Sequence, residues 1–532
     1  MAGAVLNSLR LMRAGIVMAQ HGVHFWPKGM KVPLALHAAR ALTLPVTILT
    51  WPFRIGKPRE RRISDALASL GPSYIKLGQF LATRADVIGP DLARDLSFLQ
   101  DKMAPFPLVE AKRAVAEGLQ RSVEQTFATF GPPVAAASIA QVHKATVVDP
   151  KSGASKDVAV KVLRPGIERR FKADLDSYFF AAGLVEKFHM PSRRLRPMAV
   201  VANLKRTTDL EMDLRLEAAA ISEMADNIKG DEGFRVPVVD WRRTSKRVLT
   251  LEWIDGIPVA DIAALNAAGH DTEALGLKIL RTFLRHAMRD GFFHADMHPG
   301  NLFIDRQGNV VAVDFGIMGR LSPIERKFLA EILHGLITRD FRRAAAIHFE
   351  AGYVPPHHTI ETFAQAMRAI GEPIHGRTAE DISMADLLGQ LFAYTELFDM
   401  ETRPELILLQ KSMVIVEGVA RSLNPHLNMW TAAEPVAKEW VEQNLGVAGQ
   451  LRYAGSGAVD LGRMVADVPK LMHRAQGTLE AIDSIAKNGV RLDKGVIRDL
   501  AHEQAKAGRW GRAALWVGAL ALVAIAYAML KG

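Results

Sequence analysis

The chain has 532 residues, a formal net charge of +10 and no cysteine. This length exceeds what one ordinary hydrophobic core supports, so the sequence predicts several domains. The lack of cysteine excludes disulfide bonds, thiolate metal sites and cysteine nucleophiles, and it agrees with a reducing compartment.

The positive charge is concentrated at the N-terminus. Residues 1–62 contain ten Lys or Arg and a single acid, Glu60, so this segment alone carries +9. Basic and aromatic residues are not interleaved as a nucleic-acid stacking surface requires. The apolar run 34–53 contains a histidine, an arginine and a proline, which suits a membrane surface better than a membrane span. We predict a basic membrane-surface segment over 1–62; a packed helix with a solvated basic flank is the alternative.

The next region, 63–130, is expected to be a helical extension. Gly71-Pro72 ends one helix and begins another. In the second helix Lys76 and Gln79 are three residues apart, so they share a face of the helix. Helical periodicity then gives way to strand-like sequence near residue 131, which we take as a domain boundary.

Residues 133–145 predict a strand, a tight turn of small residues and a second strand, and residues 158–162 predict a third strand. This order, ending in Val-Ala-Val-Lys, is typical of the small lobe of a protein kinase, which we place at 131–256. Lys161 would then bridge the α- and β-phosphates of ATP. An ordinary strand lysine that points to water is the plainer interpretation of the same residue.

A helix is predicted from 198 to about 228, and it carries three acids, Glu211, Asp213 and Glu217. Their spacings of two, four and six residues do not place all three on one face, so they cannot all serve Lys161. Glu217 falls where a kinase has the glutamate that pairs with the strand lysine.

Two further strands of the small lobe are predicted at 236–239 and 247–251. The segment 252–256 that follows them is interpreted as the hinge between the lobes. The backbone of this hinge, including Glu252 and Ile254, would hold the adenine ring.

The strongest chemical signal lies in two short segments with Asp296 and Asp314 eighteen residues apart. Between them the sequence predicts a strand, a hairpin turn and a second strand. This is the layout of a protein-kinase phosphoryl-transfer site. Asp296 would face the attacking hydroxyl, and Asn301 and Asp314 would hold Mg²⁺ against the ATP phosphates.

The large lobe is placed at 257–440 and departs from a typical protein kinase. Asp296 is preceded by Ala295, where such kinases have the arginine that answers activation-loop phosphorylation. No Ala-Pro-Glu element follows Gly316, and helical sequence resumes near Pro323. The devices that dock a peptide substrate are therefore missing from the sequence.

The C-terminus is expected to anchor the chain. Residues 441–512 are mixed and charged, which favours a juxtamembrane helical linker. Residues 513–530 are 18 residues without a charge, long enough to span a bilayer. Arg509 and Arg512 would place the catalytic part on the cytoplasmic side.

Four motifs together resemble the UbiB family of atypical kinase-like proteins, which is linked to ubiquinone biosynthesis. They are Lys-x-Gly-Gln at 76–79, an Ala-rich loop in place of the kinase glycine-rich loop, Glu-x-Asp at 211–213, and the pair Asp296 and Asp314. The Ala-rich loop, which would line the nucleotide, consists of Ala135, Ala136, Ala137 and Ser138.

The resemblance implies an α+β, two-lobed protein-kinase-like fold, with the helical extension over the active site and a C-terminal transmembrane helix. It also implies that Lys76 and Gln79 reach into the pocket and meet Glu211 with Asp213. Glu217 is then left for Lys161.

The function implied is that of a membrane-anchored atypical kinase or ATPase that binds MgATP and supports ubiquinone (coenzyme Q) biosynthesis, acting on or extracting lipid intermediates rather than phosphorylating proteins. A nucleotide-binding pseudokinase scaffold and a small-molecule phosphotransferase of the aminoglycoside or choline kinase kind are alternatives. Expected partners are membrane lipids, polyprenyl quinone precursors, other ubiquinone-biosynthesis proteins and a second copy in a homodimer, but not nucleic acid. The expected location is the inner membrane, facing the cytoplasm, or the mitochondrial inner membrane, facing the matrix.

Overall fold

The computed structural model describes residues 2–23, 59–82, 103–149, 151–188, 196–376 and 404–445, with isolated residues between these ranges. The chain divides into two compact units, 1–443 and 444–532, and the elements below belong to the first. The apolar runs 34–53 and 513–530 and nearly all of the predicted linker lie outside the described residues. Within the described ranges, no helix is both long and apolar enough to cross a membrane.

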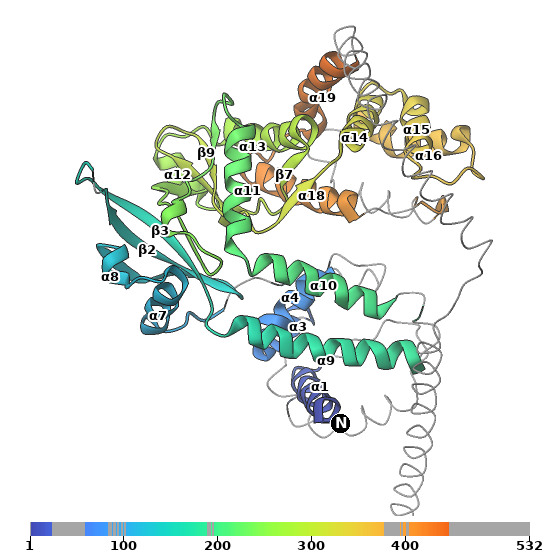
Figure 1. The fold of residues 1–532 in the computed structure, drawn as a ribbon. Helices are drawn as coiled ribbons and strands as arrows, with labels where there is room; N and C mark the ends of the chain where they lie inside the picture. Colours follow the sequence, from blue (N-terminus) through green and yellow to red (C-terminus); the bar gives the residue numbers. More distant parts are fainter. Residues whose placement is uncertain are drawn as a thin grey trace, which may run out of the picture. The chain divides into compact units, whose positions relative to one another are not determined.

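An antiparallel sheet of four strands, in the order β1-β2-β3-β5, forms the small lobe (Figure 1). Its strands are β1 (Thr129–Ala136), β2 (Ala140–Val148), β3 (Ser155–Leu163) and β5 (Val248–Glu252), which confirms the predicted strand, turn and strand and the third strand after them. Val158, Val160 and Val162 of β3 are buried in one core cluster with α7 (Leu108–Leu119). Because side chains alternate along a strand, Lys161 lies on the opposite face of the sheet.

The predicted helix over 198–228 is wrong as a single helix, because the chain breaks at Met212-Asp213. The break separates α10 (Pro197–Glu211) from α11 (Leu214–Asn227), and the two helices run in different directions (Figure 1). Asp213 has extended backbone angles, and its side chain accepts a hydrogen bond from the backbone N–H of Arg215. It therefore acts as the N-cap of α11.

A layer of helices packs beside α10. It contains α1 (Ala2–Gln20), α3 (Arg59–Leu70), α4 (Pro72–Ala82) and α9 (Ile167–Phe188), and α1 and α4 both contact α9 (Figure 1). The predicted helix break at Gly71-Pro72 is confirmed. Gly71 adopts φ of +109°, and a Cβ at this position would lie 2.0 Å from Nη2 of Arg170. Arg170 instead donates to the carbonyl of Leu70 at 2.8 Å, which fixes the turn against α9.

A second sheet, β4-β9-β8-β6, belongs to the large lobe. Its strands are β4 (Phe234–Arg235), β6 (Gly256–Pro258), β8 (Leu302–Asp305) and β9 (Val310–Ala312). The predicted small-lobe strand at 236–239 is therefore wrong, since the strand forms two residues earlier and pairs in parallel with β9. Val239 makes an isolated bridge to Leu251, which keeps this segment beside β5.

Most of the rest of the large lobe is helical, as predicted, apart from the two-stranded sheet β10-β7. Residues of α11, α13 and α18, such as Ile221, Phe283 and Val416, are buried in the largest core cluster, which joins α11 to the large lobe. The remaining elements are α8 (Val123–Thr126), α12 (Ile262–Ala267), α13 (Thr272–Arg285), β7 (Phe292–His294), β10 (Met318–Arg320), α14 (Pro323–Ile337), α15 (Phe341–Glu350), α16 (Ile360–Gly376), α18 (Pro404–Leu423) and α19 (Met429–Leu445).

Candidate active site

The candidate active site is built around the ammonium group of Lys161. Nζ of Lys161, on β3, lies 2.8 and 2.9 Å from the two carboxylate oxygens of Glu217 on α11. The same Nζ lies 3.2 Å from Oδ1 of Asp314, which follows β9. Glu217 also accepts a hydrogen bond from the backbone N–H of Phe315 at 3.4 Å. Three segments that are far apart in the sequence thus meet at one cation.

Burial and the neighbouring charges have opposite effects on the pKa values of Lys161, Glu217 and Asp314. The side chains of Lys161 and Glu217 are 15% and 7% exposed. Burial alone would lower the pKa of Lys161, but Asp314 and Glu217 raise it well above its ordinary value. Burial raises the pKa of Glu217, and the attraction of Lys161 opposes that change. Desolvation also acts to raise the pKa of Asp314, yet Lys161 and the N–H of Gly316 hold it well below its usual range. Lys161 therefore stays cationic and Asp314 anionic at neutral pH.

The loop that carries Asp296 is held by its own backbone contacts. The N–H of Asp296 donates to Nδ1 of His294 at 3.1 Å, and the carbonyl of Asp296 accepts from the amide of Asn301 at 3.0 Å. His294 is buried, which lowers its pKa, and its ring packs edge-on against Phe315 at 4.9 Å between centroids. Ser412 of α18 donates to the carbonyl of Ala295 at 3.1 Å. The position of Asp296 is therefore set from both sides of the loop.

Asn301 and Asp314 are brought near each other by the chain. The N–H of Val313 donates to the carbonyl of Asn301 at 3.0 Å, which ties the Asn301 backbone to the residue before Asp314. Since the amide nitrogen of Asn301 is bonded to Asp296, its amide oxygen is the atom that can serve as a metal ligand. One amide oxygen and one carboxylate form a hard donor set, which fits Mg²⁺.

The Ala-rich loop closes as a tight turn between β1 and β2. The N–H of Ala137 donates to the carbonyl of Ala140 at 2.8 Å. None of the three alanines, Ala135, Ala136 and Ala137, has a positive φ, so the turn needs no glycine. Ser138 is fully buried beneath this turn. The loop is thus ordinary L-residue backbone, with methyl groups where a kinase has hydrogen atoms.

Arg164 holds this loop and was missed by the sequence analysis. Its guanidinium donates to the carbonyl of Ala137 at 2.8 and 3.1 Å and to that of Ala104 at 2.9 Å. The N–H of Met103 donates to the carbonyl of Ala136 at 3.3 Å. Arg164 directly follows β3, and nothing in its sequence context distinguishes it from a surface arginine.

The segment 103–106, which contains Met103 and Ala104, is fixed a second time through Gln141 of β2. Its side-chain amide exchanges two hydrogen bonds with the backbone of Phe106, at 2.9 and 3.2 Å. Gln141 also contacts the buried His143 at 2.9 Å. Gln141 and His143 lie at alternate positions of β2, but the strand also contains Lys144 and Thr146, so the sequence did not single out this contact. Residues 103–106 of the helical extension are therefore attached to the Ala-rich loop and to the strand that follows it.

The Lys-x-Gly-Gln motif of the extension and the Glu-x-Asp motif at 211–213 meet through one residue of each. Nζ of Lys76 on α4 lies 2.7 Å from Oε2 of Glu211 at the end of α10. The expectation that Asp213 joins this contact is wrong, because its carboxylate binds the guanidinium of Arg215 at 2.6 and 2.9 Å and caps α11. Gln79 lies one turn beyond Lys76 on α4 and is half-buried. The reach of Lys76 and Gln79 into the active site stays a prediction.

The predicted hinge follows β5. The backbone N–H of Glu252 donates to the carbonyl of Val238 at 2.8 Å, so this N–H is not available to adenine. The carboxylate of Glu252 binds Arg235 at 3.0 Å, and Arg235 also binds Asp305 at 2.9 Å. Ile254 follows two residues later and is half-buried. The adenine-binding role of this segment remains a prediction.

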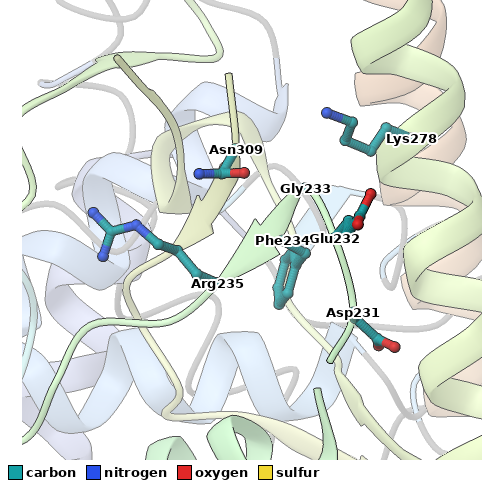
Figure 2. A pocket seen from close by; sticks show the side chains of 7 residues that line it. All are labelled: Asp231, Glu232, Gly233, Phe234, Arg235, Lys278 and Asn309. Atoms are coloured by element: carbon teal, nitrogen blue, oxygen red, sulfur yellow. The ribbon is translucent and has the colours of Figure 1, made fainter. Parts of the chain in front are cut away.

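A polar cavity of about 720 Å³ adjoins the other side of this ion-pair network (Figure 2). It lies between β4, α13 and the turn after β8, with Arg235, Lys278 and Asn309 in its lining. None of the predicted site residues lines it. Lys278 donates to the carbonyl of Gly308 at 3.1 Å, which attaches α13 to the hairpin of the catalytic pair.

The two-lobed arrangement and the Lys161 contacts define an atypical kinase-like protein. The family model "ABC1 atypical kinase-like domain" matches residues 98–348, and "UbiB helical domain" matches residues 367–428. Relatives bearing the name "Probable protein kinase UbiB" are similar over most of their length. The chain belongs to the UbiB family.

Two of these relatives show the extent of the similarity. The protein of Marinobacter nauticus is 39% identical over 422 residues, which is 78% of this chain and 76% of the relative. That of Xylella fastidiosa is 38% identical over 454 residues, covering 84% and 81%. Among solved structures, the Rv3197–erythromycin complex from Mycobacterium tuberculosis has a TM-score of 0.48 at 21% identity, covering 75% of this chain and 96% of that one.

Replacing Arg164 with Met should loosen the Ala-rich loop. The change removes the hydrogen bonds to the carbonyls of Ala137 and Ala104, and bonds from a charged donor are worth about 1.5–3 kcal/mol each in a protein. Hydrogen exchange should rise at residues 135–140. Arg170→Met is the matched control, because it frees the carbonyl of Leu70 and should raise exchange near residue 71 instead. Equal protection of residues 135–140 in Arg164→Met and the parent would show that Arg164 does not hold the loop.

Proposed function

We propose that this protein is a membrane-associated atypical kinase or ATPase that binds MgATP and supports ubiquinone biosynthesis. The observation that carries the proposal is the simultaneous contact of Lys161 with Glu217 and Asp314. A lysine held in this way presents its charge to the α- and β-phosphates, while Asp314 and Asn301 would hold Mg²⁺. Asp296 would orient the hydroxyl group or water that accepts the phosphoryl group.

The segment after Gly316 supports an acceptor other than a protein. Residues Met318–Arg320 form β10, which pairs antiparallel with β7. α14 begins at Pro323, with a capping box between Ser322 and Glu325. This short, regular connection occupies the place where a protein kinase has its peptide-docking segment. Lipid intermediates of the quinone pathway, or water itself, are therefore the proposed acceptors.

The first test separates nucleotide binding from catalysis. MgATP should raise the melting temperature of the purified protein, because a ligand that binds the folded state stabilises it by mass action. Asp314→Asn should remove most of this shift. Asp296→Asn should keep the shift but lower phosphate release by about 10²-fold or more, since it removes the group that handles the proton. An unchanged melting temperature at millimolar MgATP would contradict the proposal.

Phosphate release then decides between the enzyme and the pseudokinase scaffold. A scaffold that binds nucleotide would show the thermal shift, and its phosphate release would be the same in the parent and in Asp296→Asn. Release should be measured with and without vesicles that contain a polyprenyl phenol. If the protein is an enzyme, we expect phosphate release that depends on Asp296 and increases when the vesicles contain the phenol.

The outward face of α1 supports contact with a membrane. Val5, Leu9, Met12 and Ile16 lie on one side of this helix, and their side chains are 37–60% exposed. The opposite side docks on α9 through polar groups, such as Arg10, whose guanidinium donates to the carbonyl of Ala173 at 2.9 Å. An apolar stripe that faces outward, in a segment with a charge of +9, suits the interface of an anionic bilayer.

Labelling can test this contact in the full chain, since the protein has no cysteine of its own. An environment-sensitive fluorophore on Met12→Cys should gain intensity and shift to the blue with anionic vesicles, and high salt should reduce the change. The matched control is Val109→Cys on α7, which is 79% exposed and should not respond. Equal responses at the two positions would rule out a membrane contact through α1.

The remaining parts of the proposal concern location and assembly. Residues 513–530 would provide a single C-terminal pass of the inner membrane, with the catalytic domain on the cytoplasmic side, or on the matrix side in a mitochondrion. Other ubiquinone-biosynthesis proteins and a second copy of the chain are the proposed partners.

A further inference from the structure

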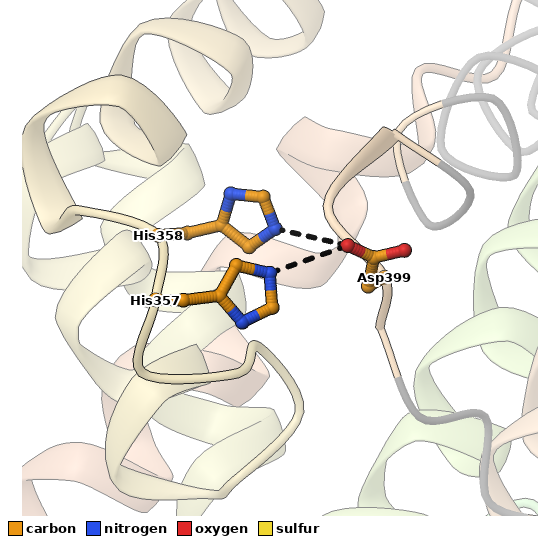
Figure 3. A group of neighbouring side chains, drawn as sticks. All are labelled: His357, His358 and Asp399. Carbon is orange, nitrogen blue, oxygen red and sulfur yellow. Dashed lines mark hydrogen bonds and ion pairs between the residues drawn. The ribbon is translucent and has the colours of Figure 1, made fainter.

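Two histidines and an aspartate converge at a second place in the large lobe (Figure 3). His357 and His358 lie in the turn between α15 and α16, and Asp399 precedes α18. Nε2 of His357 lies 3.3 Å from Oδ2 of Asp399, and Nε2 of His358 lies 3.4 Å from the same oxygen. The potential ligand atoms of the three residues all lie within 4.8 Å of one another.

The two nitrogen–oxygen distances match those between ligands of a tetrahedral metal ion. With bonds of about 2.0–2.1 Å from the metal to nitrogen and oxygen, neighbouring ligand atoms lie about 3.3–3.4 Å apart. Both imidazoles present the same ring nitrogen, Nε2, to the carboxylate (Figure 3). Neutral imidazole and carboxylate are ligands that Zn²⁺ and related divalent ions accept together.

Hydrogen bonding accounts for the cluster only in part. Nε2 of His358 is shielded from solvent, yet among the described residues it finds no hydrogen-bond partner of good geometry. A shielded ring nitrogen without such a partner is unfavourable, and a bond to a metal ion would satisfy it. The side chains of His357 and Asp399 are 61% and 67% exposed, so one side of the cluster is open to water.

Aromatic side chains of the core pack against one side of the cluster. The ring of His358 packs against Phe398, with centroids 5.1 Å apart, and Phe398 packs against the fully buried Phe363 at 4.9 Å. Asp399 directly follows Phe398 and adopts a positive φ of 48°. The ring of His358 and the residue before Asp399 are thus held by the aromatic core.

We propose that His357, His358 and Asp399 bind one divalent transition-metal ion, such as Zn²⁺, with water in the fourth position. This site differs chemically from the proposed Mg²⁺ site, which has an amide oxygen and a carboxylate and no nitrogen ligand. A hard ion such as Mg²⁺ disfavours imidazole, so the two sites select different ions.

Cobalt titration of the full-length protein tests the proposal. The purified chain is stripped with a chelator, the chelator is removed, and Co²⁺ is added in excess Mg²⁺, which occupies oxygen-ligand sites. One equivalent of Co²⁺ should give the intense visible absorption of tetrahedral coordination, and Zn²⁺ should displace it. His357→Ala and Asp399→Asn should each weaken Co²⁺ binding by more than about tenfold, since even changes behind the ligands reach that size. His426→Ala, a change of an exposed histidine in the turn after α18, should leave binding unchanged.

His357 and Asp399 are largely exposed, so their variants should fold, and equal melting temperatures in the absence of metal would verify this. The proposal is overturned if the parent shows no tetrahedral absorption. It is also overturned if the parent and the double variant His357→Ala/Asp399→Asn bind Co²⁺ with equal affinity. Either result would mean that the cluster is a surface ion pair, an interaction worth at most about 1 kcal/mol.

Discussion

The arrangement of the whole site depends on the contact of one ammonium group with two carboxylates. Lys161 comes from the small-lobe sheet, Glu217 from the helix beside it, and Asp314 from the hairpin of the large lobe. Lys161 and Glu217 are buried, so either charge would be unfavourable without its partner, because desolvation of a charge is costly. The contact of Lys161 with Asp314 is the part of this arrangement that joins the small lobe to the large lobe.

The direction of α11 is the local feature that makes this contact available. If α10 and α11 were one helix, Glu217 would lie on the same helix axis as Glu211, which contacts Lys76. The cap at Asp213 starts a new helix, so Glu217 turns towards Lys161 while Glu211 remains with the extension. Glu211 and Glu217 therefore each pair with a different lysine. Arg164 connects Ala104 of the same extension to Ala137 of the Ala-rich loop. The extension is therefore joined to the small lobe at two separate places.

The sequence was sufficient to predict those parts of the site that depend on hydrophobic periodicity and on the spacing of motifs. The apolar run around Lys161 predicted its strand, and the hairpin between Asp296 and Asp314 formed as expected. The break before α11 was not predictable from apolar spacing, because it depends on a side-chain cap that competes with a continuous helix. Arg164 could not be identified either, since its partners are backbone carbonyls of distant segments. The cluster around His357 also exists only in the folded chain, because its carboxylate comes from a different segment.

A double-mutant cycle between Lys161 and Glu217 tests the central claim most directly. The unfolding free energy is measured by chemical denaturation for the parent, Lys161→Met, Glu217→Gln and the double variant. Because each single change leaves a buried partner unpaired, the account predicts a loss of about 3–5 kcal/mol for Lys161→Met. It also predicts that the double variant loses less than the sum of the single losses, by about 1 kcal/mol or more. Losses that add to within about 0.5 kcal/mol would contradict the account, since they would mean that the two side chains do not interact.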